Sequence, residues 1–288
     1  MNFYTNVGSG VSTVKLAANL YMPKSERKVA AMIIISSSSG VLDNIEGYYA
    51  RSFVESGIAA LVVDSFKPRR VSRTSSDQSL VTSWAMENDA FAALLVLKKD
   101  SRIDPDRIGV IGVSKGGTAA QNSAFTLRRG GRHTGTLAFA LHVAIVPDCV
   151  TQQFRNAATT GAPLLYMLAE LDDLTPSKPC LEYADRIRGS GNKNVEIKVY
   201  AGQHHGWEVI GPVIAAKDTE NYSACAAMID DNGDYTIKAN NRSVGRWQAG
   251  AWMKQNCVTR GAHVGGGTQK QKQLATNDLI AFLKRNGF

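Results

Sequence analysis

The pentapeptide Gly112-Val113-Ser114-Lys115-Gly116 is the most informative stretch of this sequence. It matches the pattern G-x-S-x-G, and it lies between an apolar segment at 107–112 and a run of small residues. In a nucleophile elbow the serine occupies a strained turn, and the flanking glycines let strand and helix approach closely. The alternative is an ordinary glycine-rich loop that holds a phosphate. The strand-turn-helix context favours an elbow with Ser114 as the nucleophile.

Apolar runs alternate with helix-like segments on both sides of this motif. We expect strands at 32–35, 58–63, 107–112, 137–146, 163–169 and 195–200, and helices at 45–55, at 84–97, from 115 and at 271–285. This alternation predicts an α/β fold with a mostly parallel central sheet and helices on both faces. In such sheets the functional residues gather beyond the carboxyl ends of the strands.

Acidic residues and histidines stand at two of those strand ends. Asp172 and Asp173 follow the strand at 163–169, and His204 and His205 follow the strand at 195–200. A serine needs a base and an orienting acid, and in this architecture they come in the order Ser, Asp/Glu, His. The chain has five histidines, and two of them lie at the one place where the base is required.

Four segments together resemble the dienelactone hydrolase family of α/β-hydrolases. They are the elbow and the segments Val63–Arg69, Glu170–Pro176 and Gly202–Trp207. The resemblance covers roughly residues 10 to 210 and the last helix. In the family pattern a proline stands four residues after the acid, and Gly plus an aromatic residue follow the histidine. The resemblance therefore implies Asp172 and His205 as the partners of Ser114.

Two departures from the family pattern change the expected chemistry. The archetypal family member uses a cysteine nucleophile, whereas this chain has Ser114, so we expect an esterase rather than a dienelactone hydrolase. The loop after the first predicted strand is rich in serine instead of His and Gly. Because an oxyanion hole needs backbone N–H groups, we assign its donors by position to Lys115 and Ser38. Ser39 is an alternative donor and is otherwise expected to bind the substrate. The alternative interpretation is that the serine run is a flexible loop that supplies no donor.

The predicted function is hydrolysis of a small-molecule carboxylic ester through an acyl-enzyme, without a metal or organic cofactor. A serine peptidase or amidase is the second enzymatic reading, since the same residues cleave amides. A non-catalytic binding protein on the same scaffold is the third, and the complete Ser/Asp/His set argues against it. Asp230, Asn232 and Asp234 resemble a calcium loop, but the glycine comes too early for an EF-hand.

The stretch 207–267 breaks the alternating pattern. It is rich in glycine and aromatic residues, and Asp231-Asn232-Gly233-Asp234 predicts a hairpin turn. We interpret it as an insertion before the C-terminal helix of a single domain spanning 1–288. Because it begins two residues after His205, we expect it to cap the active site. Trp207, Trp247 and Trp252 would then line an apolar pocket; alternatively, they only hold the insertion to the body.

Charge and hydropathy exclude two other classes of protein. The net charge is +8, but the basic residues are scattered and the densest clusters, 67–70 and 128–132, are short. Without an aromatic-interleaved basic stripe or finger spacing, we expect no nucleic-acid partner. No run of 18 apolar residues is present, so no membrane span is expected. The sequence does not indicate an oligomeric state.

The four cysteines contain no CxxC pair, so the sequence predicts no zinc site. We expect Cys149 to pair with Cys180, because their loops follow neighbouring strands, and Cys225 with Cys257, because both lie in the insertion. Two disulfides indicate a periplasmic or secreted protein that has lost a signal peptide. The alternative is a cytoplasmic protein with four buried thiols.

Overall fold

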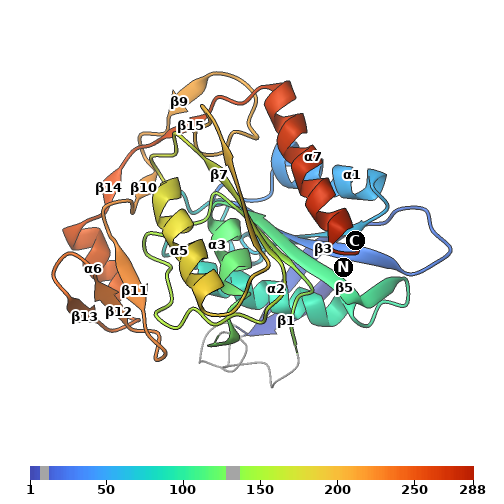
Figure 1. Cartoon of the computed structure of the whole chain (residues 1–288), viewed down its shortest axis with the longest axis horizontal. Helices are drawn as coiled ribbons and strands as arrows, with labels where there is room; N and C mark the ends of the chain where they lie inside the picture. Colours follow the sequence, from blue (N-terminus) through green and yellow to red (C-terminus); the bar gives the residue numbers. More distant parts are fainter. Residues whose placement is uncertain (7–12, 128–136) are drawn as a thin grey trace.

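An eight-stranded sheet forms the centre of the protein in the computed structural model, which describes residues 1–6, 13–127 and 137–288 (Figure 1). Its strand order is β1-β2-β4-β3-β5-β6-β7-β8. The bounds are β1 (Asn2–Asn6), β2 (Thr13–Tyr21), β3 (Val29–Ile35), β4 (Ala59–Asp64), β5 (Ile103–Val113), β6 (His142–Ile145), β7 (Leu164–Ala169) and β8 (Val195–Tyr200). All pairs from β4 to β8 are parallel, as predicted, whereas β1 and β2 add an antiparallel edge that was not foreseen. The basic cluster 128–132 lies outside the described residues.

Helices cover both faces of the sheet. The helices α1 (Tyr48–Glu55) and α7 (Gln269–Arg285) pack on one face, and α2 (Ser83–Leu97), α3 (Lys115–Asn122) and α5 (Ser177–Gly189) pack on the other. Successive residues of a strand point to opposite faces, so a strand covered on both sides must be apolar throughout. In β3 all seven residues are buried, and they alternate between two separate core clusters. A mostly parallel sheet between two layers of helices is the α/β-hydrolase fold that was expected.

The segment expected as one helix at 45–55 has two parts. A π-helical turn, η1 (Asp43–Gly47), precedes α1. A second short element, the 3₁₀ turn η2 (Lys67–Arg69), follows β4. At the other end of the chain, α7 begins at Gln269, two residues before the predicted start, because Thr268 and Gln271 form a capping box there.

The insertion builds small elements of its own. They are β9 (Val213–Ala215), β10 (Glu220–Asn221), β11 (Ala227–Ile229), β12 (Tyr235–Ile237), β13 (Arg242–Val244), α6 (Ala249–Asn256), β14 (Thr259–Arg260) and β15 (His263–Gly265). The hairpin predicted at 231–234 is confirmed, since β11 pairs antiparallel with β12 around it. Figure 1 shows β11–β13 and α6 gathered at one end of the molecule, beyond α5, with β9 and β15 along one edge. The insertion leaves and re-enters the body at one place, where Ile210 bridges Gly267.

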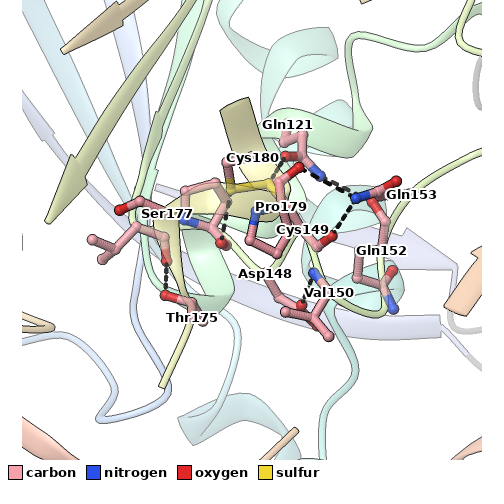
Figure 2. The surroundings of a disulfide bond; sticks show 12 residues. Gln121, Asp148, Cys149, Val150, Gln152, Gln153, Thr175, Ser177, Pro179 and Cys180 are labelled. Atoms are coloured by element: carbon pink, nitrogen blue, oxygen red, sulfur yellow. Dashed lines mark hydrogen bonds between the residues drawn. A yellow bond between two sulfur atoms is a disulfide. The ribbon is translucent and has the colours of Figure 1, made fainter. Parts of the chain in front are cut away.

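Both expected disulfides are present. Cys149 and Cys180 join the loop after β6 to α5 (Figure 2), and Cys225 and Cys257 join two parts of the insertion. They close loops with sequence separations of 31 and 32 residues, so each contributes about 3–4 kcal/mol in the chain-entropy model. In the described part of the chain, no helix is both long and apolar enough to cross a membrane.

Candidate active site

Ser114 lies in a strained turn between β5 and α3. Its backbone has φ +56° and ψ −117°, a conformation that costs a non-glycine residue on the order of 1–3 kcal/mol. A Cβ atom at Gly112 would come within 2.2 Å of the backbone of Gly116, and one at Gly116 within 2.4 Å of the carbonyl oxygen of Ile35. The two glycines therefore permit the close packing of α3 on β5 that holds Ser114 at the carboxyl end of the sheet.

Ser114, His205 and Asp172 form one chain of hydrogen bonds. The Ser114 Oγ lies 2.8 Å from His205 Nε2, and His205 Nδ1 lies 2.8 Å from Asp172 Oδ2. All three residues are buried. Asp172 follows β7 and His205 follows β8, so three strand ends bring together residues that lie up to 91 positions apart. Since Asp172 accepts from Nδ1–H, Nε2 is left to accept the serine proton.

The carboxylate of Asp172 is held by a turn that the sequence analysis did not single out. Its Oδ1 accepts the backbone N–H groups of Leu174 and Thr175 at 2.9 and 2.8 Å. The Thr175 hydroxyl lies 3.0 Å from Asp172 Oδ2 and 3.0 Å from the carbonyl oxygen of Val146. Val146 has φ +40°, which is rare for a β-branched residue. Thr175 stands three residues after the aspartate, a spacing typical of an Asx turn that could have identified it.

Burial and the carboxylate act on His205 in opposite directions. Burial lowers the pKa of His205, but the charge and hydrogen bond of Asp172, together with the charges of Glu208 and Asp173, raise this pKa by more, so the net shift is upward. The buried carboxyl of Glu208 adds to the upward shift. The imidazolium is therefore favoured here more than in water, which is what a base needs when it takes a proton from serine.

The neighbouring residues Asp173 and His204 do not join this chain. Asp173 Oδ2 lies 2.7 Å from His263 Nδ1, and its Oδ1 accepts the backbone N–H of His263 at 2.9 Å. The rings of His204 and His263 lie 6.1 Å apart. The structure thus contains a second aspartate–histidine pair, between the acid loop and the insertion.

A buried glutamate that the sequence analysis missed holds the serine-rich loop. Glu46 accepts the backbone N–H of Ser37 at 3.0 Å through Oε1 and that of Leu42 at 2.8 Å through Oε2. The N–H of Ser39 donates to Ser37 Oγ. Among the described residues, no partner is recorded for the N–H of Ser38, which leaves it available. Burial raises the pKa of Glu46 to about 7, against its two backbone hydrogen bonds.

The side chain of Lys115 bonds to the loop at 74–78 rather than to Ser114, His205 or Asp172. Its Nζ donates to Thr74 Oγ1 at 3.0 Å and to the Gln78 carbonyl at 2.8 Å. Burial lowers the pKa of Lys115 to about 7, although the charges of Glu220 and Asp77 oppose this shift. Glu220 in turn accepts the N–H of Gln78 at 2.7 Å, so the insertion is tied to the loop beside the elbow.

The three tryptophans do not meet at the site. Trp207 is fully buried and packs against Tyr200 in the core, so its position does not fit the substrate-binding role expected for it. Trp247 is 69% exposed, with the guanidinium of Arg246 4.9 Å from its ring centre. Trp252 is half-buried and packs against the core cluster that the insertion shares with α5 and β7. In the described parts of the chain, no hydrogen bond or ring contact joins Trp247 or Trp252 to Ser114, Asp172 or His205.

Metal-ligand geometry is not found around these residues. The described residues contain no group of three or more His, Cys, Asp or Glu side chains that would hold a metal ion. Asp230, which suggested a calcium loop, accepts the backbone N–H groups of Asn232 and Asp234 and so stabilises the hairpin turn.

Comparison with known proteins agrees with the geometry. The family model for the dienelactone hydrolase family matches residues 16–230. A Bradyrhizobium protein named as a probable 2-oxo-3-(5-oxofuran-2-ylidene)propanoate lactonase is 23% identical over 209 residues, covering 70% of this chain and 82% of the relative.

Two solved structures share the fold. A Klebsiella pneumoniae protein provisionally assigned as a dienelactone hydrolase has a TM-score of 0.59 and 13% identity, covering 99% of this chain and 98% of its own. A thermophilic esterase from Thermogutta terrifontis, solved with propionate bound, has a TM-score of 0.54 and 16% identity, covering 71% of this chain and 85% of its own. Since the family model spans well over half of the chain, this protein belongs to the dienelactone hydrolase family.

Proposed function

We propose that this protein is a carboxylic ester hydrolase that works through a serine acyl-enzyme. The observation that carries the proposal is the hydrogen-bond chain from Ser114 Oγ through His205 to Asp172, with 2.8 Å at both links. A serine hydroxyl is a weak nucleophile until a base removes its proton, and a base of this kind needs a third group to fix its tautomer.

In the first half of the reaction, Ser114 Oγ attacks the ester carbonyl carbon while its proton passes to His205 Nε2. The carbonyl oxygen becomes an oxyanion and accepts the backbone N–H groups of Lys115 and Ser38. The C–O bond to the alcohol then breaks, and the departing oxygen takes the proton from Nε2. The alcohol leaves, and the acyl group stays on Ser114 as an ester.

In the second half, water takes the place of the alcohol. His205 Nε2 accepts a proton from water as its oxygen attacks the acyl carbon, and the same two N–H groups hold the new oxyanion. When this intermediate collapses, Ser114 Oγ regains a proton from Nε2 and the carboxylic acid is released. Asp172 keeps the Nδ1 proton of His205 hydrogen-bonded throughout and stabilises the imidazolium.

The relatives support an ester as the bond that is cleaved. A lactone is a cyclic ester, so the relative named as a lactonase acts on the same functional group. The Thermogutta terrifontis protein that shares the fold is an esterase. Cleavage of an amide would require the same residues, and no contact of the described site favours it over an ester.

Labelling with a fluorophosphonate tests the nucleophile directly. We expect the wild type to be labelled at Ser114 and Ser114→Ala to remain unlabelled. An ester and an amide with the same acyl group should then be compared, with the ester hydrolysed faster. Faster cleavage of the amide would assign the protein to the amidases, and an unlabelled, inactive wild type would leave a binding protein as the better description.

We further propose that the insertion caps the site. The support for a cap is that β15 is bridged to His205 and that Glu220 of the insertion binds the loop beside Lys115.

We also propose that the protein works in an oxidising compartment. The support for the compartment is the pair of disulfides. Fractionation of the native cells, with thiol counting on the recovered protein, tests the location. Four free thiols would contradict it.

A further inference from the structure

A short ribbon of three segments lies beside the candidate base. β15 pairs antiparallel with β9, with Val264 opposite Ile214. On the other edge of β15, Val264 bridges the backbone of His205 in parallel, and the N–H of Gly265 donates to the His205 carbonyl at 2.8 Å. His205, Val264 and Ile214 therefore form one row across the ribbon.

The register fixes which side chains share a face. Residues directly opposite one another in paired strands project to the same side, and their neighbours along the chain project to the other. Val264 and Ile214 accordingly stand on the face that carries the His205 ring. His204 and His263 occupy the reverse face, and their rings lie 6.1 Å apart, as this register requires.

The row changes from buried and polar to exposed and apolar as it leaves the site. His205 is buried, Val264 is half-buried, and Ile214 is 56% exposed. More than half of the surface of Ile214 stays in water, and this part gains nothing from folding. It gains only if another apolar group covers it.

The chemistry of the proposed reaction indicates which group that is. The proton on His205 Nε2 goes to the departing alcohol oxygen, so the alcohol portion of the ester must lie against His205. The carbonyl oxygen lies instead at the N–H groups of Lys115 and Ser38. An apolar surface that continues from His205 therefore meets the alcohol side of the substrate.

We propose that Val264 and Ile214 form the binding surface for an apolar alcohol portion of the ester. This inference rests on the proposed ester hydrolysis and adds a substrate class to it, namely esters of aliphatic alcohols. Because the surface is open on the Ile214 side, it accepts chains of increasing length. Each methylene that it covers adds to the affinity for the transition state of acylation.

Two series of esters separate the alcohol side from the acyl side. One holds the acyl group at acetyl and lengthens the alcohol from methyl to hexyl; the other holds the alcohol at methyl and lengthens the acyl group. In the wild type, kcat/KM should rise with alcohol length. Ile214→Ser should lose about tenfold on hexyl acetate and nothing on methyl acetate, since partly covering several methylenes is worth about that much.

The timing of the steps adds a second readout. Once the alcohol has left, the acyl-enzyme is the same whatever the alcohol was, so Ile214→Ser should leave the deacylation rate unchanged. Val213→Ser is the matched control, because Val213 is an exposed residue of the same strand on the opposite face. It should leave both series unchanged.

The possible outcomes separate the two proposals. No hydrolysis of any ester by the wild type overturns both. Hydrolysis with an alcohol profile that Ile214→Ser does not change, or a change confined to the acyl series, overturns the surface alone. Gel filtration covers the other occupant: if Ile214→Ser breaks up an oligomer without altering the alcohol profile, the side chain serves a second copy of the chain instead.

Discussion

Asp172–His205 and Asp173–His263 are two aspartate–histidine pairs that begin from adjacent aspartates. Their N–O distances are nearly equal, at 2.8 and 2.7 Å. The side chains of the first pair are 0% and 8% exposed, whereas those of the second are 44% and 60% exposed. Among the described residues, only the first pair has a serine hydroxyl on the far side of the imidazole. The contrast teaches that an aspartate–histidine bond is not enough to propose a catalytic base; burial of the pair and a serine partner are what favour His205.

Removal of the serine or of its base should have the largest effect. We expect Ser114→Ala and His205→Ala each to lower kcat by about six orders of magnitude, with little further loss in the double variant, because the residues act as a unit. His263→Ala should change kcat less than tenfold. Steady-state kinetics on one activated ester measures all four proteins, with circular dichroism to verify folding. A loss of many orders in His263→Ala would reverse the roles of the two pairs.

Exchange of each aspartate for asparagine compares the two acids directly. Asp172→Asn should lower kcat by about four orders of magnitude, because the amide favours the wrong tautomer of His205. Asp173→Asn should cost less than tenfold, since its partner His263 does not touch the serine. The same assay serves for both, and an equal loss in the two variants would show that the loop, rather than the charge of Asp172, is what matters.

The pH dependence of kcat/KM distinguishes the pairs more finely. His205 must be neutral to accept a proton, so activity should fall as the pH drops below its pKa, which Asp172 raises against the effect of burial. In Asp172→Asn that support is lost while burial remains, so the acid limb should move to lower pH. In Asp173→Asn the limb should move the same way by less, because Asp173 is the weakest contributor to the shift. A limb that stays in place in Asp172→Asn would contradict the assignment.

The exposed pair should matter least, and for stability rather than rate. His263→Gln should lower the free energy of unfolding by less than about 1 kcal/mol, as is usual for ion pairs in contact with solvent. Burial raises the pKa of Asp173, but its bonds to His263 lower it by more. The pair's small contribution to stability is therefore fully present above the pKa that Asp173 has in the unfolded chain. It is lost as the pH falls through the lower pKa that Asp173 has in the folded protein. Urea unfolding at neutral and acid pH measures it; a loss of several kcal/mol would indicate that the pair anchors the insertion.

Much of the fold could be predicted because its central strands have a distinctive apolar composition. Strands buried on both faces, such as β3, must be apolar throughout, and the glycines of the elbow mark a contact that tolerates no Cβ. The antiparallel strands β1 and β2 were not predicted because they lack this continuous apolar pattern: β2 mixes Lys15 and Asn19 with its apolar residues. An antiparallel strand commonly buries only one face, so its composition is less distinctive.

The site could be predicted only as far as its residues stand at strand ends. Ser114, Asp172 and His205 do, and the structure brings them together. Glu46 does not, because its role comes from a tertiary contact between a π-helical turn and the serine-rich loop. Trp207 was expected to bind substrate because it is close to His205 in the sequence. That closeness does not determine the direction of its ring, which is buried in the core.

The bridge between Ile210 and Gly267 places the two ends of the insertion side by side. The N–H of Gly211 donates to the Gly267 carbonyl, and the N–H of Gly267 to the Val209 carbonyl, both at 3.2 Å. A few residues would close the gap between these ends, and doubling a loop costs only about 0.6 kcal/mol of closure entropy. The two ends of the segment thus lie side by side, so a change in its length does not by itself require the strands before Ser114, Asp172 and His205 to move apart.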